Sequence, residues 1–216
     1  MEFIVVNFSQ LRTVRSGGNA VGPSNQTLAI NGGVHTLTLD GPQDYLPLSQ
    51  RLVVAQTSVA SPLRVTFTLM AATFTAKFPA AIFGAANTAK SFDAFLTALG
   101  PLGLTWTIER NGAFGGGRAE ANFEIDEASG EAWVIAALDS ASFSPHRHNS
   151  GRSYGELVLT LAGELTDITD AGNAIVLGPG KAMAHGPDTV HSPAATGFWA
   201  GLFYRPRGVT AQPVQA

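Results

Sequence analysis

The sequence contains no cysteine. Disulfide bonds, zinc–thiolate sites and cysteine nucleophiles are therefore excluded, although this absence does not fix the cellular compartment. Charged residues are also scarce, at 13% of the 216 residues, and the formal net charge of −3 provides no basic stripe. Binding of nucleic acid through its phosphates is therefore not expected.

Long hydrophobic runs are missing as well. The uncharged stretch between Arg64 and Lys77 is far too short to span a bilayer. The first residues contain neither a basic segment nor a long apolar one, so we expect no signal peptide. The sequence therefore predicts a soluble, cytoplasmic protein that does not associate with membranes.

What the sequence has in abundance favours β-structure. It contains 24 glycines, 12 prolines and many threonine-rich alternating segments, which together predict a mainly β chain. Apolar and polar residues alternate over 63–69, 72–78 and 104–109, as in half-buried strands. Residues 131–137 are apolar on both faces, which is typical of a central strand. Asn31-Gly32-Gly33 lies between two short apolar runs and predicts a β-hairpin over 27–39.

One segment follows a helical pattern instead. Phe92, Phe95, Leu96 and Leu99 have the i, i+3, i+4, i+7 spacing of an apolar stripe. We predict one short helix, at about residues 88–99, which ends at Gly100-Pro101 and covers one face of a sheet.

The histidines are concentrated in one part of the chain. Four of the five lie within residues 144–191, namely His146, His148, His185 and His191. His146 and His148 are two residues apart, so in extended backbone both side chains point to the same side, as a chelating pair must. Glu156 opens the apolar run between the two histidine pairs. The working hypothesis is a metal site inside a β-barrel.

The run that follows Glu156 supports an inward carboxylate. Glu156, Val158 and Thr160 share one face of the expected strand, and three leucines (157, 159 and 161) share the other. We expect the leucine face to pack on another sheet or on a partner subunit. An inward carboxylate is costly to bury alone, and a metal ion or an Arg or His partner would offset that cost.

These residues resemble the cupin superfamily. Its first motif, G(X)5HXH(X)3-4E(X)6G, is matched by His146-Arg147-His148, Glu156 and Gly163, with the six-residue gap before the glycine conserved in length. Its second motif, G(X)5PXG(X)2H, can be laid on Gly180, Gly186-Pro187-Asp188 and His191. The resemblance covers roughly residues 132–206, the size of a minimal barrel, and does not cover residues 1–110.

The sequence departs from the family pattern in three places. Seven residues, Asn149–Gly155, separate His148 from Glu156 where the family has three or four. Ser140 stands where the opening glycine should be. Gly186 and Asp188 replace the proline and glycine of the second motif. The long insert puts the role of Glu156 as a ligand in question.

The resemblance implies a cupin-type double-stranded β-helix, or jelly-roll barrel, with a divalent metal held by His146, His148, Glu156 and His191. These ligand types suit zinc, iron, manganese, nickel or copper and do not choose among them. The family also implies a metal-dependent enzyme that acts on a small organic molecule, with dioxygenase, isomerase or lyase chemistry.

Several alternatives stay open. The barrel could lack a metal and hold a ligand or water, or serve as a non-enzymatic small-molecule- or metal-sensing module. Glu156 could act as a catalytic base if the insert moves it away from the metal. His185 is expected to be a supporting or structural residue, although a shift in register would let it replace His191. The fifth histidine, His35, is expected to be a packed or edge residue.

The remaining expectations concern domains and partners. We expect a β-rich N-terminal region over 1–110, either a degenerate barrel or an extension of the main one, then a cupin barrel over 111–208 and a flexible tail over 209–216. Cupins often dimerise through an apolar face, so a homodimer is also expected. Arg147, Arg152 and Tyr154 are candidates for orienting an anionic substrate, or else exposed to solvent.

Overall fold

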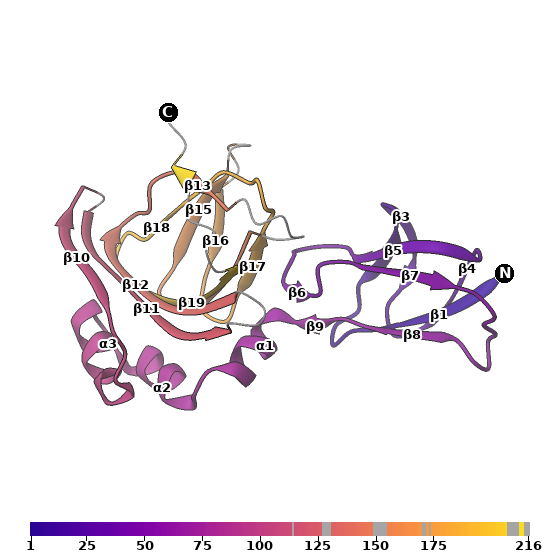
Figure 1. Cartoon of the computed structure of the whole chain (residues 1–216), viewed down its shortest axis with the longest axis horizontal. Helices are drawn as coiled ribbons and strands as arrows, with labels where there is room; N and C mark the ends of the chain where they lie inside the picture. Colours follow the sequence, from indigo (N-terminus) through magenta and orange to yellow (C-terminus); the bar gives the residue numbers. More distant parts are fainter. Residues whose placement is uncertain are drawn as a thin grey trace. The chain divides into compact units, whose positions relative to one another are not determined.

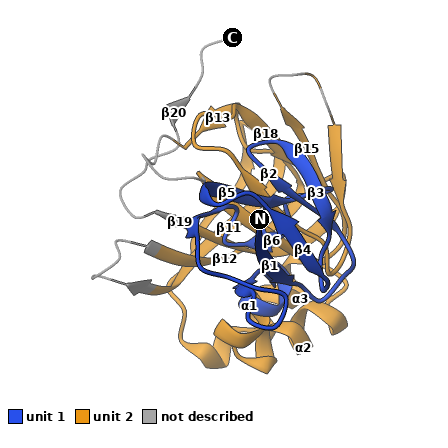
Figure 2. Ribbon diagram, turned by 90° about the vertical axis from the view of Figure 1, so that its right-hand side faces the viewer, with its two compact units in different colours: residues 1–73 blue, residues 74–216 orange. Residues whose placement is uncertain are grey.

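The computed structural model describes residues 1–113, 115–126, 131–148, 155–169, 172, 174–206 and 212–213. Most of these residues lie in strands and few lie in helices, which confirms the mainly β prediction. The chain divides into two compact units, Met1–Thr73 and Phe74–Ala216 (Figure 2).

The first unit consists of short strands arranged in three sheets. A three-stranded sheet has the order β4-β1-β8, a four-stranded sheet the order β3-β2-β5-β7, and β6 pairs with β9. The strand bounds are β1 (Glu2–Asn7), β2 (Thr13–Ser16), β3 (Asn19–Pro23), β4 (Thr27–Ile30), β5 (Gly33–Leu39), β6 (Tyr45–Leu46), β7 (Gln50–Val54), β8 (Leu63–Thr66) and β9 (Thr68–Leu69).

This unit has its own hydrophobic core, built around Ile4, Leu37 and Tyr45. The buried Tyr45 hydroxyl donates to the carbonyl oxygen of Leu39 and accepts from its N–H, at 2.9 Å in both cases. The hairpin expected over residues 27–39 is wrong. β4 pairs with β1 and β5 pairs with β2 and β7, so the two strands around Gly32 belong to different sheets.

In the described part of the chain, three helices come between β9 and the strands of the second unit. They are α1 (Met70–Lys77), α2 (Ala80–Thr88) and α3 (Phe92–Ala98), and a short 3-10 turn, η1 (Gly100–Leu102), follows them. α3 falls within the helix predicted at about 88–99. The hydroxyl of Ser91 caps it by accepting from the N–H of Ala94 at 3.3 Å.

The prediction of a single helix was incomplete, and the strand predicted at 72–78 was wrong. Phe74 and Phe78 lie on one face of a strand, but they are also four residues apart and share one face of a helix. In the structure this segment forms helix α1, and Phe78 directly follows the helix. Their rings stack at 6.3 Å, and each packs edge-on against Trp133, at 5.3 and 5.5 Å between centroids.

The second unit is a barrel made of two sheets. A six-stranded sheet has the order β10-β11-β12-β19-β14-β17, and a five-stranded sheet has the order β16-β15-β18-β13-β20 (Figure 1). The strand bounds are β10 (Thr107–Gly112), β11 (Gly115–Asp126), β12 (Glu131–Ala141), β13 (His146–Arg147), β14 (Glu156–Ala162), β15 (Leu165–Thr169), β16 (Ala174–Leu177), β17 (Ala182–His185), β18 (His191–Ala194), β19 (Phe198–Pro206) and β20 (Gln212–Pro213). The predicted β-barrel is observed.

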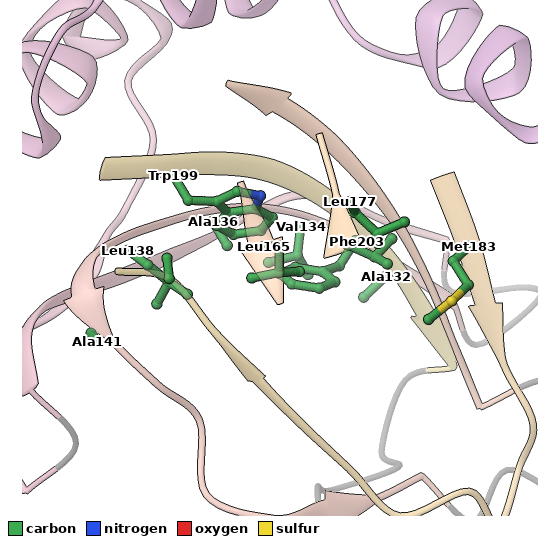
Figure 3. Close-up of a cluster of buried hydrophobic side chains, with 12 residues drawn as sticks. Ala132, Val134, Ala136, Leu138, Ala141, Leu165, Leu177, Met183, Trp199 and Phe203 are labelled. Carbon is green, nitrogen blue, oxygen red and sulfur yellow. The ribbon is translucent and has the colours of Figure 1, made fainter. Parts of the chain in front are cut away.

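The barrel interior is apolar along most of its length. β12 is central, as predicted, and its residues Ala132, Val134, Ala136 and Leu138 point inward against Trp199 and Phe203 (Figure 3). Val158 belongs to the same cluster, and Thr160 beside it accepts a hydrogen bond from the indole N–H of Trp199 at 3.1 Å. The inward face predicted for the Glu156 strand is therefore observed.

The outer face of the six-stranded sheet is covered by helices. α2 contacts β14, and α3 contacts β12 and β19, where Phe95 packs on Phe198 at 5.9 Å between ring centroids (Figure 1). Leu157 and Leu159 are buried. The expectation that another sheet or a partner subunit covers this face is corrected, because helix α2 of the same chain does so.

The units divide at a different place from the sequence-based boundary. We expected the N-terminal region to run over residues 1–110 and the barrel over 111–208, whereas the compact units meet between Thr73 and Phe74. The reason is that α2, α3 and β10 pack on the barrel. Of the expected tail, residues 209–216, only 212–213 are described, and they pair with β13.

Candidate metal centre

The structure brings together all four residues that the sequence predicted as metal ligands. His146 begins β13, Glu156 begins β14 and His191 begins β18, while His148 follows β13. Each side chain offers one ligand atom, and these atoms all lie within 4.8 Å of one another. All four residues are buried, with exposed fractions of 6% or less.

Two distances between the carboxylate and the imidazoles of this group are longer than ordinary hydrogen bonds. Oε1 of Glu156 lies 3.6 Å from Nε2 of His148, and Oε2 lies 4.0 Å from Nε2 of His191. Two ligand atoms bonded to one zinc-sized ion at about 2.1 Å are separated by about 3.4 Å at a tetrahedral angle. The spacing therefore resembles that of ligands around an ion more than that of hydrogen-bonded partners.

Local structure fixes where each side chain points. His146 is paired directly with His191 across β13 and β18, so both side chains lie on the same face of the sheet. His146 Nδ1 lies 2.7 Å from the carbonyl oxygen of Ser144. Because a carbonyl only accepts, Nδ1 carries the proton and Nε2 keeps its lone pair.

The long insert still returns the chain to the site. Of residues 149–155 only Gly155 is described, and its N–H donates to the carbonyl oxygen of His185 at 2.9 Å. A Cβ at position 155 would lie 2.8 Å from Cβ of His148 and 3.0 Å from the carbonyl oxygen of Gly186. Glycine is therefore what allows the chain to pass this close to His148 before Glu156 begins.

A second buried group adjoins the first. Oδ2 of Asp167 lies 2.9 Å from Nε2 of His185 and 3.0 Å from Nδ1 of His191. These are hydrogen-bond distances. Burial by itself would raise the pKa of Asp167, but its hydrogen bonds with His185 and His191 outweigh burial and hold the pKa well below its usual range.

The protonation of His191 suits ligation. Burial lowers the pKa of His191 to about 4, even though its hydrogen bond with Asp167 acts in the opposite direction. The imidazole is therefore neutral at pH 7, as a metal ligand must be. Its Nε2 is buried and has no hydrogen-bond partner among the described residues. A buried polar atom of this kind, aimed at a carboxylate and two further imidazoles, fits a metal ion.

A pocket of about 230 Å³ adjoins this group. His146 forms part of its wall, together with residues of β10, β11 and the segment before β13: Thr107, Glu109, Arg118, Glu120, Phe143 and Ser144. The guanidinium of Arg118 is 2.6 Å from the carboxylate of Glu109 and lies over the ring of Phe143 at 5.2 Å. The wall is therefore polar, with one aromatic face.

The other residues considered from the sequence lie elsewhere. His35, in the first unit, hydrogen-bonds through its two ring nitrogens to Ser16 and to the carbonyl oxygen of Asn31, both at 2.8 Å, as expected of a structural residue. Arg147 is exposed on β13. Arg152 and Tyr154 lie outside the described residues.

Sequence reasoning missed Asp167. It belongs to no motif, and the one available signal was strand parity, which places it on the same face as the buried Leu165.

No helix in the described part of the chain is long and apolar enough to cross a membrane.

Fold and side chains together define a two-sheet barrel with an internal group of three histidines and one glutamate. No protein-family model matches the sequence, and no curated protein does. Solved structures do resemble it, and several of them are cupin proteins.

A cupin 2 conserved barrel domain protein from Rhodopseudomonas palustris aligns with a TM-score of 0.45 and 15% identity, over 53% of this chain and 79% of that one. A predicted oxalate decarboxylase from Thermotoga maritima aligns with a TM-score of 0.41 and 19% identity, over 48% and 93%. A structure titled for the DMSP lyases RdDddP and RnDddQII aligns with a TM-score of 0.44 and 12% identity, over 57% of this chain and 69% of that one. These likenesses concern the fold alone.

Proposed function

We propose that the barrel binds one divalent transition-metal ion through His146, His148, Glu156 and His191 and acts as a metal-dependent enzyme on a small organic molecule. The observation that carries this proposal is the convergence of four buried donor groups within 4.8 Å inside the barrel. Imidazole nitrogens with one carboxylate suit zinc, iron, manganese, nickel or copper better than calcium or magnesium.

A metal at this position would act as a Lewis acid and as a template for an oxygen-bearing substrate. The chain's own residues prepare the site for that role. The Ser144 carbonyl holds His146 with its Nε2 lone pair available, and the two oxygens of Glu156 face different histidines. The apolar cluster that contains Val158 and Phe203 fills the neighbouring interior and excludes bulk water from it.

Glu156 is the proposed catalytic residue as well as a ligand. Its carboxylate is buried among imidazoles, where it can bind the ion or accept a proton from a bound substrate. Replacing it by glutamine keeps the shape and removes the charge. We expect Glu156→Gln to weaken metal binding and to abolish turnover.

The pocket beside His146 is the proposed substrate entrance. Thr107 is exposed on β10 and lines this pocket, so Thr107→Trp would fill it without replacing a ligand. The neighbouring Ile108 is 47% exposed and does not line the pocket. We expect Thr107→Trp to block small-molecule binding at unchanged metal content and Ile108→Trp to have no effect; equal binding in both variants would contradict the entrance.

Elemental analysis of the purified protein tests the metal itself. Wild type is expected to carry stoichiometric metal after supplementation, His148→Ala and His191→Ala to lose it, and His35→Ala to keep it as the matched histidine control. A wild type without metal would refute the proposal. Oxygen consumption over a panel of diketones and phenols then tests dioxygenase chemistry, and a metal-loaded protein that turns over no substrate would favour a sensing module.

A further inference from the structure

The group formed by Asp167, His185 and His191 has no part in the proposed ligand set beyond its shared histidine. All three residues are buried, with exposed fractions of 3% or less. The Asp167 carboxylate accepts from Nδ1 of His191 through Oδ2, at 3.0 Å, and from the N–H of Ser192 through Oδ1, at 3.1 Å, while Nε2 of His185 lies 2.9 Å from Oδ2. Two hydrogen-bond donors and a third nitrogen therefore converge on one buried carboxylate.

This arrangement determines the tautomer of His191. A carboxylate accepts hydrogen bonds and does not donate them, so the Nδ1 of His191 that faces Oδ2 at 3.0 Å must carry the proton. The lone pair is then on Nε2, the atom that faces Glu156 at 4.0 Å. Nε2 of His185 lies 2.9 Å from the same Asp167 oxygen.

Asp167 also connects the two sheets that supply the ligands. Asp167 on β15 and His191 on β18 belong to the five-stranded sheet, whereas His185 on β17 belongs to the six-stranded sheet and is paired directly with Glu156. The ring of His185 stacks on that of His191, with centroids 4.0 Å apart and planes at 25°. His191 is thus held by a hydrogen bond at one edge and by a parallel ring at its face.

We propose that Asp167 is a positioning residue that holds His191 in the Nδ1–H tautomer, with His185 as a stacking support, so that Nε2 of His191 is directed at the metal. The effect on metal affinity rests on the proposed function, whereas the choice of tautomer does not. Removing partners of this kind weakens metal binding by about 10- to 100-fold.

The test combines a tautomer measurement with metal affinity. Long-range ¹H–¹⁵N correlation spectra of metal-free, ¹⁵N-labelled full-length protein distinguish the two tautomers, and His191 is assigned by comparison with His191→Gln. We expect Nδ1–H in wild type. In Asp167→Asn the amide NH2 must face either Ser192 N–H or the histidines, so His191 should lose its exclusive Nδ1–H form. Zinc competition titration should show about 10- to 100-fold weaker binding.

Asp139→Asn is the matched control. Asp139 is exposed on β12, so this substitution makes the same chemical change away from the site. It should leave both tautomer and affinity unchanged. If Asp167→Asn does not fold, the wild-type spectrum alone decides the assignment. An Nε2–H tautomer of His191 in wild type, or an Asp167→Asn protein with wild-type zinc affinity, would overturn the proposal.

The two proposals fail in distinguishable ways. A wild type that binds neither zinc nor iron, manganese, nickel or copper refutes the proposed function and the expected loss of affinity, yet its His191 tautomer can still be measured and still tests the role of Asp167. A wild type that binds zinc with His191 as Nε2–H refutes the positioning role and leaves the metal site in place.

Discussion

Loss of one metal ligand should appear directly as loss of metal-dependent stability. The unfolded chain cannot hold His146, His148, Glu156 and His191 within 4.8 Å, so metal binds the folded barrel almost exclusively. At a free metal concentration 1,000 times the Kd, binding stabilises the fold by about 4 kcal/mol. For a unit the size of residues 74–216 this corresponds to a rise in Tm of about 8–16 °C.

His191→Gln removes one ligand from the group. A 100-fold loss of affinity would remove about 2.7 kcal/mol of the metal-dependent stabilisation, or most of the rise in Tm. The assay is thermal unfolding followed by tryptophan fluorescence, with and without a chelator. All three tryptophans, Trp106, Trp133 and Trp199, lie in the second unit, so the signal follows the barrel and not residues 1–73.

The histidine of the first unit provides the control. His35→Gln should melt with the same metal-induced rise as wild type, because His35 bonds to Ser16 and Asn31 and not to the cluster. The reasoning is refuted if metal does not change the wild-type Tm, or if His191→Gln shows the full rise.

Three further predictions concern stability. Gly163→Ala should destabilise the barrel by at least about 1 kcal/mol more than Gly180→Ala in urea unfolding. Both glycines have a positive φ (70° and 76°), but a Cβ at position 163 would lie 2.1 Å from a backbone oxygen, whereas a Cβ at position 180 would meet nothing within 4 Å. Equal losses of stability in the two variants would contradict this. Thr160→Val leaves the buried indole N–H of Trp199 without its partner and should cost about 1–3 kcal/mol, whereas Thr160→Ser should cost less. The pKa of His191 is lowered from 6.5 to about 4 in the folded state, so the unfolded chain binds more protons between these pH values. The free energy of unfolding of the metal-free protein should therefore fall by up to about 3 kcal/mol as the pH falls from 7 to 4. The same pH dependence of stability in His191→Gln would contradict this.

Local pattern was reliable where it had only one interpretation. Residues 132–136 are apolar on both faces, which fits a central strand and little else, and β12 is central. It failed where two structures satisfied the same pattern. Phe74 and Phe78 share a face in a strand and in a helix, and packing against Trp133 selected the helix. Around Gly32, the turn signal was present, but the flanking strands found partners in different sheets.

For the candidate site, too, some features could be predicted from the sequence and others depended on the tertiary structure. The sequence by itself singled out His146, His148, Glu156 and His191 as candidate ligands, because they match, in order, the motifs of the cupin superfamily that the sequence resembles. Only the tertiary structure decided that Glu156 reaches the histidines after the long insert, since closure depends on the close contact between Gly155 and His148. It also placed Asp167 beside His191 on the neighbouring strand of the same sheet and beside His185 on the other sheet of the barrel, and neither contact can be read from the sequence.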